Sequence, residues 1–135
     1  MTSFHHVSIS AADEAKSVRF YEKLGFSPVY RWASPTGELR IIHMKLGDAM
    51  LEIFNYSNPQ DAPETTRSLD TDLPRLGIKH FGLKVVDIED ARKNILTLGL
   101  ANGLEIREGR TGIKYFFVND PDGNWIEFVQ DDRGL

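Results

Sequence analysis

Apolar and polar residues alternate along the first strand-like segment of the chain, residues 4–10. Val7 and Ile9 fall on one face of this strand, and His6 falls on the other. A helical pattern follows, and then three more extended segments separated by short turns that contain glycine. The order of segments predicts a βαβββ unit whose strands are residues 4–10, 26–34, 38–46 and 49–55.

The helix of this unit is predicted from both of its ends. Asp13 stands where an N-cap residue accepts hydrogen bonds from free backbone N–H groups, and Gly25 stands where a helix ends in the left-handed conformation. Between them Val18, Tyr21 and Leu24 lie along one helical face. We therefore expect a helix from residue 13 to about residue 24, packed on the apolar face of the strands.

The same pattern recurs 74 to 75 residues further along the chain. Aligned pairs are His6 with His80, Asp13 with Asp87, Leu24 with Leu98, Gly25 with Gly99, and Glu52 with Glu127. The second unit is expected to have a strand from residue 78, a helix over 87–99, a weak strand at 104–106, and strands at 113–119 and 124–130. Agreement at both ends of the unit, in the same order, makes chance a poor explanation.

The predicted fold class is therefore α+β, with two tandem βαβββ modules in a single domain of residues 1–135. The modules span about 3–56 and 78–130, and residues 57–77, rich in Pro, Asp, Thr and Ser, are interpreted as a linker. Neither module can enclose a site alone, so we expect their mixed sheets to form a curved trough with the helices outside. The two modules could pair within one chain or across a homodimer.

Composition narrows the chemistry. The chain has no cysteine, which excludes disulfides, thiolate nucleophiles and cysteine-based zinc sites, so any metal must be held by His and carboxylate groups. The net charge is −4, and Lys and Arg are scattered, which argues against nucleic acid as a partner. No signal-peptide pattern or membrane-length apolar run is present, so we expect a cytoplasmic protein without a membrane partner.

Four residues stand on the face of the strands that the helices do not cover: His6, Glu52, His80 and Glu127. Each Glu has apolar neighbours in its strand, and burying a carboxylate there is costly unless charge or hydrogen bonds compensate. A lone strand His is more often a satisfied or exposed residue than a ligand. The His-to-Glu interval, however, recurs in both modules. We therefore predict one divalent metal site made of these four residues, suited to zinc, nickel, cobalt or manganese.

Two further histidines compete for a role. His5 is a rival for His6, but it is expected on the other strand face, and Lys79 occupies its repeat position. His43 is interpreted as a strand surface residue. An anionic substrate could be met by Arg31, Arg40 and Lys114, although scattered strand cations usually face solvent.

The motifs resemble the vicinal oxygen chelate superfamily, which includes glyoxalase I, methylmalonyl-CoA epimerase, extradiol dioxygenases and bleomycin- and fosfomycin-resistance proteins. The resemblance covers about residues 3–130, and its most specific part is the Asp-Pro-Asp-Gly-x-x-x-Glu segment of residues 120–127. The other matching motifs are His6-Val7-Ser8-Ile9, Phe20-Tyr21, Leu24-Gly25-Phe26, Leu51-Glu52-Ile53 and His80-Phe81-Gly82-Leu83.

A His, Glu, His, Glu set resembles that of glyoxalase I, a lactoylglutathione lyase. The resemblance implies a nickel-, zinc- or cobalt-dependent lyase or isomerase acting on a small molecule with adjacent oxygens, by proton transfer through an enediolate that the metal stabilises. It assigns the catalytic base to Glu127, with Glu52 as a ligand and possible second base. It also implies a homodimer.

The departures from glyoxalase I concern glutathione. Ser10 stands where that enzyme usually carries an Arg, and Tyr56 stands where it carries an Asn. The metal chemistry therefore transfers better than the glutathione site. The alternatives are an epimerase of an acyl thioester, which typically has Gln at the position of Glu52, a metabolite- or drug-binding resistance protein without the metal, and an iron-dependent dioxygenase.

Overall fold

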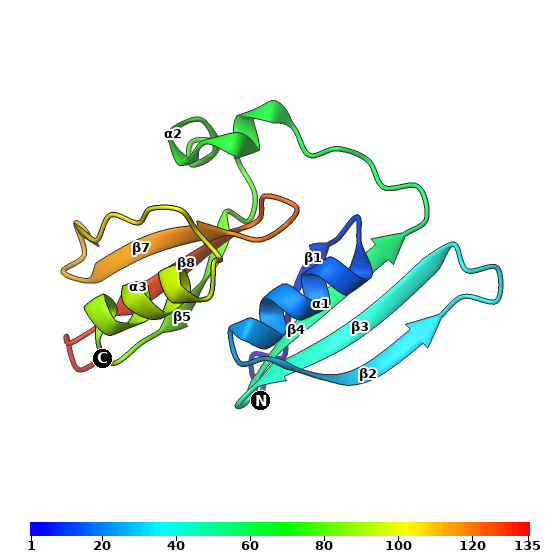
Figure 1. Cartoon of the computed structure of the whole chain (residues 1–135), viewed down its shortest axis with the longest axis horizontal. Helices are drawn as coiled ribbons and strands as arrows, with labels where there is room; N and C mark the ends of the chain where they lie inside the picture. Colours follow the sequence, from blue (N-terminus) through cyan, green and yellow to red (C-terminus); the bar gives the residue numbers. More distant parts are fainter. The chain divides into compact units, whose positions relative to one another are not determined.

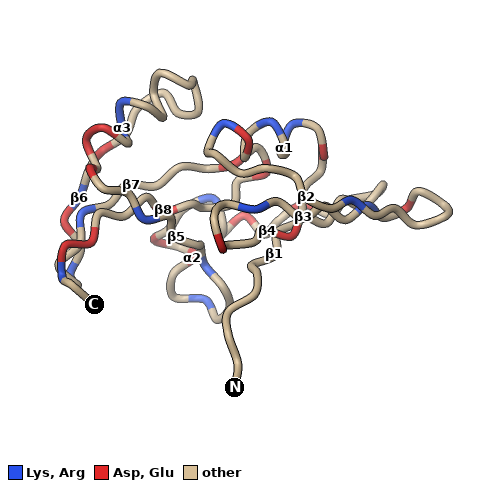
Figure 2. The backbone as a smooth tube through the Cα atoms, turned by 90° about the horizontal axis from the view of Figure 1, so that it is seen from below, with Lys and Arg blue, Asp and Glu red and all other residues tan.

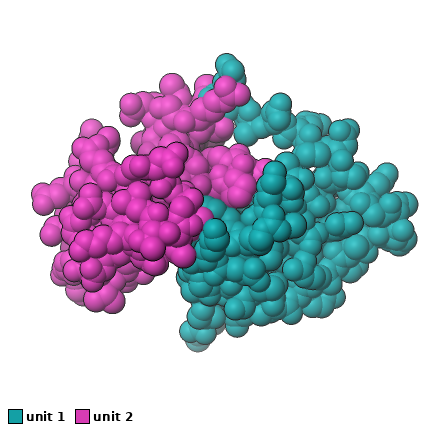
Figure 3. All heavy atoms as spheres, in the orientation of Figure 1, with its two compact units in different colours: residues 1–64 teal, residues 65–135 magenta.

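The computed structural model describes all residues, 1–135, and the chain forms two compact units. Unit 1 comprises Met1–Glu64 and unit 2 comprises Thr65–Leu135 (Figure 3). Each unit has its own four-stranded mixed sheet. Figure 1 shows one long helix, α1 or α3, beside each sheet. The α+β class and the two βαβββ modules predicted from the sequence are confirmed. The trough that the modules were expected to form together stays a prediction.

Unit 1 follows the predicted order of elements. Its parts are β1 (Val7–Ser10), α1 (Glu14–Lys23), β2 (Ser27–Ala33), β3 (Leu39–Leu46) and β4 (Ala49–Tyr56). The strands are arranged in the order β1-β4-β3-β2, with β1 parallel to β4 and the other pairs antiparallel. The first strand thus lies beside the last one, which places Ser8 next to Glu52 in register.

Helix α1 begins and ends where the sequence predicts. The Asp13 side chain accepts a hydrogen bond from the backbone N–H of Lys16, and Gly25 follows the helix with φ of 96°. Tyr21 is fully buried, and its ring contacts Phe26 edge-on at 5.6 Å between centroids. The helix covers the sheet face that carries the other buried residues of this core, Ile42, Met44, Leu51 and Ile53.

Unit 2 repeats this topology. It begins within a 3-10 helix, Glu64–Arg67, whose first residue is the last of unit 1. The elements that follow are a short helix α2 (Leu69–Asp72), β5 (His80–Lys84), α3 (Ile88–Thr97), β6 (Arg107–Glu108), β7 (Lys114–Asn119) and β8 (Trp125–Gln130). The strand order is β5-β8-β7-β6, with β5 parallel to β8. Phe116 and Phe128 stack at 5.0 Å in a core that also holds Ile95 and Ile126.

Two details differ from the sequence analysis. The weak strand expected at 104–106 lies at Arg107–Glu108 instead, because only these residues pair with β7. The segment interpreted as a linker includes the two short helices at 64–67 and 69–72. Its residue Asp72 is buried, and the Lys79 ammonium donates to the Asp72 backbone carbonyl at 2.9 Å.

Charged residues show no segregation along either unit. Basic and acidic positions are interspersed along the backbone in Figure 2. None of the helices has the length and apolar composition that crossing a bilayer requires.

Candidate metal and acid–base site

Glu52 lies at the centre of β4, on the sheet face that α1 does not cover, and accepts hydrogen bonds at both carboxylate oxygens. Ser8, its neighbour on β1, donates through Oγ to Oε1 at 2.8 Å. His43, its partner on β3, lies with Nε2 2.8 Å from Oε2. An ionised carboxylate can only accept, so Nε2 of His43 carries the proton.

The same contacts keep Glu52 in its ionised form. The hydrogen bond from His43 is the largest cause of a lowered pKa for Glu52, and the hydroxyl of Ser8 and the nearby His6 lower it further. Partial burial opposes them by raising the pKa. Donors on two flanking strands therefore favour the carboxylate as a charged group, which is the form that binds metal ions.

His6 stands beside Glu52, as predicted. Its Nε2 lies 3.5 Å from Glu52 Oε1. Its other ring nitrogen, Nδ1, lies 2.8 Å from Nδ1 of His5. The structure thus places His5 against His6 rather than on an opposite strand face, because β1 begins only at Val7 and strand alternation does not extend to residues 5 and 6. A metal-binding His usually has its second nitrogen hydrogen-bonded, and His5 fills that position for His6.

His80 and Glu127 form the matching pair in unit 2. Nε2 of His80 lies 3.2 Å from Oε2 of Glu127. Nδ1 of His80 is buried without a hydrogen-bond partner. The ring is instead held by an edge-on contact with Phe117 at 5.0 Å between centroids. One nitrogen of His80 therefore faces a carboxylate, while the other contributes no hydrogen bond.

The two carboxylates have different neighbours although their exposures are nearly the same, 17% for Glu52 and 16% for Glu127. Where Ser8 and His43 pair with Glu52, Gly82 and Phe117 pair with Glu127. Neither glycine nor phenylalanine has a side-chain donor. The environments of Glu52 and Glu127 therefore differ in hydrogen bonding and not in burial.

The spacing within each pair suits metal coordination. Two atoms bound to one zinc-sized ion at about 2.1 Å lie roughly 3.0–3.4 Å apart at octahedral and tetrahedral angles. The nitrogen–oxygen distances of 3.5 Å and 3.2 Å are close to that range. Neither unit alone gathers three or more His, Asp or Glu side chains in a metal-binding cluster. Each unit thus holds one His–Glu pair whose side chains and spacing fit a divalent metal ion.

A cleft of about 360 Å³ lies in unit 2 next to this pair. Its aromatic lining is Tyr115, Phe117 and Trp125, and its polar lining comes from the segments around Arg67 and Arg107. The indole N–H of Trp125 donates to the backbone carbonyl of Thr66 at 2.8 Å, which ties the 64–72 segment to the sheet. Phe117 contacts both the cleft and the ring of His80, so the cleft adjoins the candidate site.

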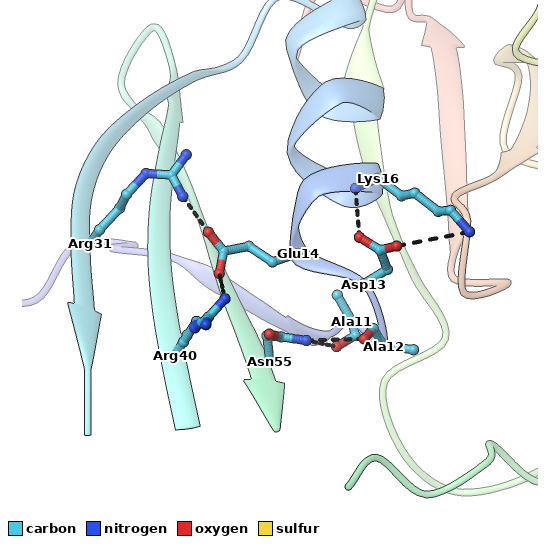
Figure 4. A network of polar contacts seen from close by, with 8 residues as sticks. All are labelled: Ala11, Ala12, Asp13, Glu14, Lys16, Arg31, Arg40 and Asn55. Carbon is cyan, nitrogen blue, oxygen red and sulfur yellow. Dashed lines mark hydrogen bonds and ion pairs between the residues drawn. The ribbon is translucent and has the colours of Figure 1, made fainter. Parts of the chain in front are cut away.

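Arg31 and Arg40 belong to the other sheet face. Both guanidinium groups pair with the Glu14 carboxylate at the start of α1, Arg40 at 3.5 Å (Figure 4). Figure 4 also shows the Asn55 amide donating to the carbonyls of Ala11 and Ala12. These contacts hold the helix start to the sheet, and they place both arginines on the face opposite Glu52.

His43 is the site residue that the sequence analysis undervalued. The interpretation as a surface residue is wrong, because His43 contacts Glu52 directly and is partly buried. A signal for it exists in the sequence. Leu46 pairs with Ala49 across the two-residue turn Gly47-Asp48, and counting back along both strands from such a hairpin brings position 43 opposite position 52.

Comparison with known proteins places the chain in a family. Residues 3–128 match the Glyoxalase/Bleomycin resistance protein/Dioxygenase superfamily. The match covers both units and all four predicted ligands. The chain belongs to this superfamily, and the resemblance inferred from its motifs is confirmed.

Individual relatives agree with this assignment. The chain is 29% identical over 132 residues to the uncharacterized protein YaeR of Escherichia coli (strain K12), covering 93% of this chain and 94% of that protein. A glyoxalase family protein from Enterococcus faecalis is 30% identical, with a TM-score of 0.78 over 95% of this chain and 97% of that one. The trypanothione-dependent glyoxalase I of Leishmania major shares the fold, with a TM-score of 0.70 at 20% identity over 96% and 87% of the two chains.

Proposed function

We propose that this protein is a divalent-metal-dependent lyase or isomerase of the glyoxalase I type, which moves a proton between adjacent carbons of a small substrate. The observation that carries the proposal is the His–Glu pair at the same place in each unit, with nitrogen–oxygen distances of 3.5 Å and 3.2 Å. A repeated pair of metal-ligand side chains on the uncovered face of two equivalent sheets has no role in packing either core.

The residues that would hold the metal are His6, Glu52, His80 and Glu127. Four ligands require the His–Glu pair of a unit 1 and the His–Glu pair of a unit 2. The two units would belong to one chain or to two chains of a homodimer. The ion would be nickel, zinc or cobalt, with manganese also suited to this donor set. Once bound, it would supply Lewis acidity to two adjacent oxygens of the substrate.

The proton would be moved by the carboxylates. We assign the base to Glu127, which would take the proton from the carbon beside a carbonyl and return it to the neighbouring carbon. Glu52 is assigned as ligand, with a possible part as second base. The two positions paired in register with Glu127, Gly82 and Phe117, carry no side-chain donor, and this supports the division, because a base must exchange a proton freely during each turnover.

The body of the substrate would occupy the cleft in unit 2. A volume of about 360 Å³ falls in the range of small-molecule sites, and an aromatic wall suits the apolar part of such a substrate. Phe117, which lies between this cleft and His80, would keep that part against the reacting carbons.

A second candidate function is favoured by Ser10 and Tyr56. These residues replace the Arg and Asn that glyoxalase I uses near glutathione, so a thiol adduct other than that of glutathione, or an acyl thioester in an epimerase reaction, would be turned over by the same metal and carboxylates. A protein that binds a drug or metabolite without conversion is the remaining alternative within the superfamily.

The test is a comparison of substrates on protein loaded with nickel, cobalt or zinc. Turnover of the adduct of methylglyoxal and glutathione supports the glyoxalase reaction. Turnover of an acyl thioester alone supports the epimerase. Oxygen uptake with a catechol on iron-loaded protein would identify a dioxygenase and contradict the proposal.

A further inference from the structure

We propose that Ser8 and His43 are positioning residues that fix Glu52 as a stationary metal ligand, and that their absence beside Glu127 leaves that carboxylate able to move as the base. This inference rests on the proposed function and deepens it. It assigns different tasks to two residues that the internal repeat makes equivalent.

The first step is the geometry around Glu52. Oε1 accepts from Ser8 and Oε2 accepts from His43, both at 2.8 Å, and the two donors come from strands on opposite sides of β4. Rotation of the carboxylate about its side-chain bonds would break at least one of these hydrogen bonds. Both donors sit on paired strands and not on loops, so their backbones stay in place if the carboxylate moves.

The second step is the comparison with Glu127. Its neighbours in register are Gly82 on β5 and Phe117 on β7, and its one polar contact is with His80. Glycine also leaves space beside the carboxylate: a β-carbon built at Gly82 would lie 3.8 Å from Glu127 Oε2. The carboxylate of Glu127 can therefore change its orientation with fewer contacts to break than the carboxylate of Glu52.

The third step is the consequence for metal binding. Carboxylates that bind metals are themselves usually hydrogen-bonded, and loss of such outer partners typically weakens metal binding by about 10- to 100-fold. With Oε2 engaged by His43, the oxygen that remains nearest to His6 is Oε1, at 3.5 Å from Nε2. His43 therefore presents one particular oxygen of Glu52 beside the histidine ligand.

The experiment compares His43→Phe, which copies the residue at the equivalent position of unit 2, with His43→Gln, whose amide can still donate. Tyr30→Phe is the matched control, because Tyr30 pairs with His43 on β2 and has no contact with Glu52. Dissociation constants for nickel and cobalt are measured by competition with a chelator, and the visible spectrum of bound cobalt reports the number of ligands. Crystal structures of the metal-free wild type and His43→Phe show whether Glu52 occupies one conformer or several.

We expect His43→Phe to weaken metal binding by about 10- to 100-fold with an unchanged cobalt spectrum, and His43→Gln to recover most of the loss. Glu52 should occupy one conformer in the metal-free wild type and several in His43→Phe. Unchanged affinity and a single Glu52 conformer in His43→Phe would overturn the inference. A changed cobalt spectrum in both variants would overturn it too, by making His43 a ligand. If the wild type takes up no metal but the conformers behave as expected, the positioning stands and the proposed function fails.

Discussion

Ser8 in β1 and Gly82 in β5 occupy the same position in the two modules, each paired in register with the glutamate of the last strand. Ser8 donates a hydrogen bond to Glu52 at 2.8 Å, whereas Gly82 has no side chain to donate one to Glu127. Ser8 and Gly82 differ by one hydroxymethyl group, so Glu52 has a hydroxyl donor at the paired position of the first strand and Glu127 has none.

Gly82→Ser tests the distinction in unit 2. The β-carbon fits, because its nearest neighbours would lie at 3.8 Å and Gly82 has ordinary backbone geometry. The new hydroxyl should donate to Glu127 and slow proton transfer, and we expect kcat to fall about tenfold or more with little change in metal content. The measurement is steady-state kinetics beside elemental analysis. Gly82→Ala is the control for bulk, and an equal loss in both variants would attribute the effect to crowding.

Glu127→Gln should abolish turnover while a substantial part of the metal remains. The amide oxygen can still coordinate, but the group can no longer accept and return a proton. Elemental analysis and activity are measured on the same preparation. Retained activity would remove Glu127 from the role of base and leave Glu52 as the candidate.

Metal binding should stabilise the fold. Free metal at one hundred times its dissociation constant stabilises the native state by about 2.7 kcal/mol, which corresponds to a rise in Tm of roughly 10 °C for a chain of this size. Calorimetry with and without nickel measures the shift. His6→Ala should abolish it, whereas His5→Ala should only reduce it, because His5 contacts the second nitrogen of His6. Equal shifts in wild type and His6→Ala would exclude His6 from the ligand set.

Trp125→Phe should loosen the 64–72 segment. The substitution removes the hydrogen bond from the indole to the Thr66 carbonyl and should lower the free energy of unfolding by about 1 kcal/mol. Hydrogen exchange should rise in residues 65–72 and stay unchanged in β7. Trp32→Phe is the control, because that side chain is 44% exposed and lines no part of the unit 2 cleft. Unchanged exchange in residues 65–72 would show that the segment is held by other contacts.

Much of the fold was predictable because its signals are local. Asp13 and Asp87 cap their helices as expected, and Gly25 and Gly99 take the positive φ that ends them. The position of β6 could not be predicted, because a two-residue strand is defined by its pairing with β7 and leaves no periodic pattern in the sequence.

The candidate site was predictable only in part. The repeat identified the residues that lie together as His6 with Glu52 and His80 with Glu127. The contact of His43 with Glu52 depends on strand register, and alternation along a single strand does not contain that information. The pairing of Phe117 with Glu127 depends on strand register in the same way. A comparison of the two modules position by position is needed to see that Phe117 stands where unit 1 has His43.

The presence of a metal centre is tested most directly by the metal content of the purified protein after loading with nickel, cobalt or zinc and removal of excess ions. We predict one divalent ion per chain, whether the two pairs meet within a chain or across a dimer, and loss of that ion in a His6→Ala, His80→Ala double variant. No bound metal under any loading condition would exclude the proposed metal centre, and a binding protein without a metal would then be the better interpretation.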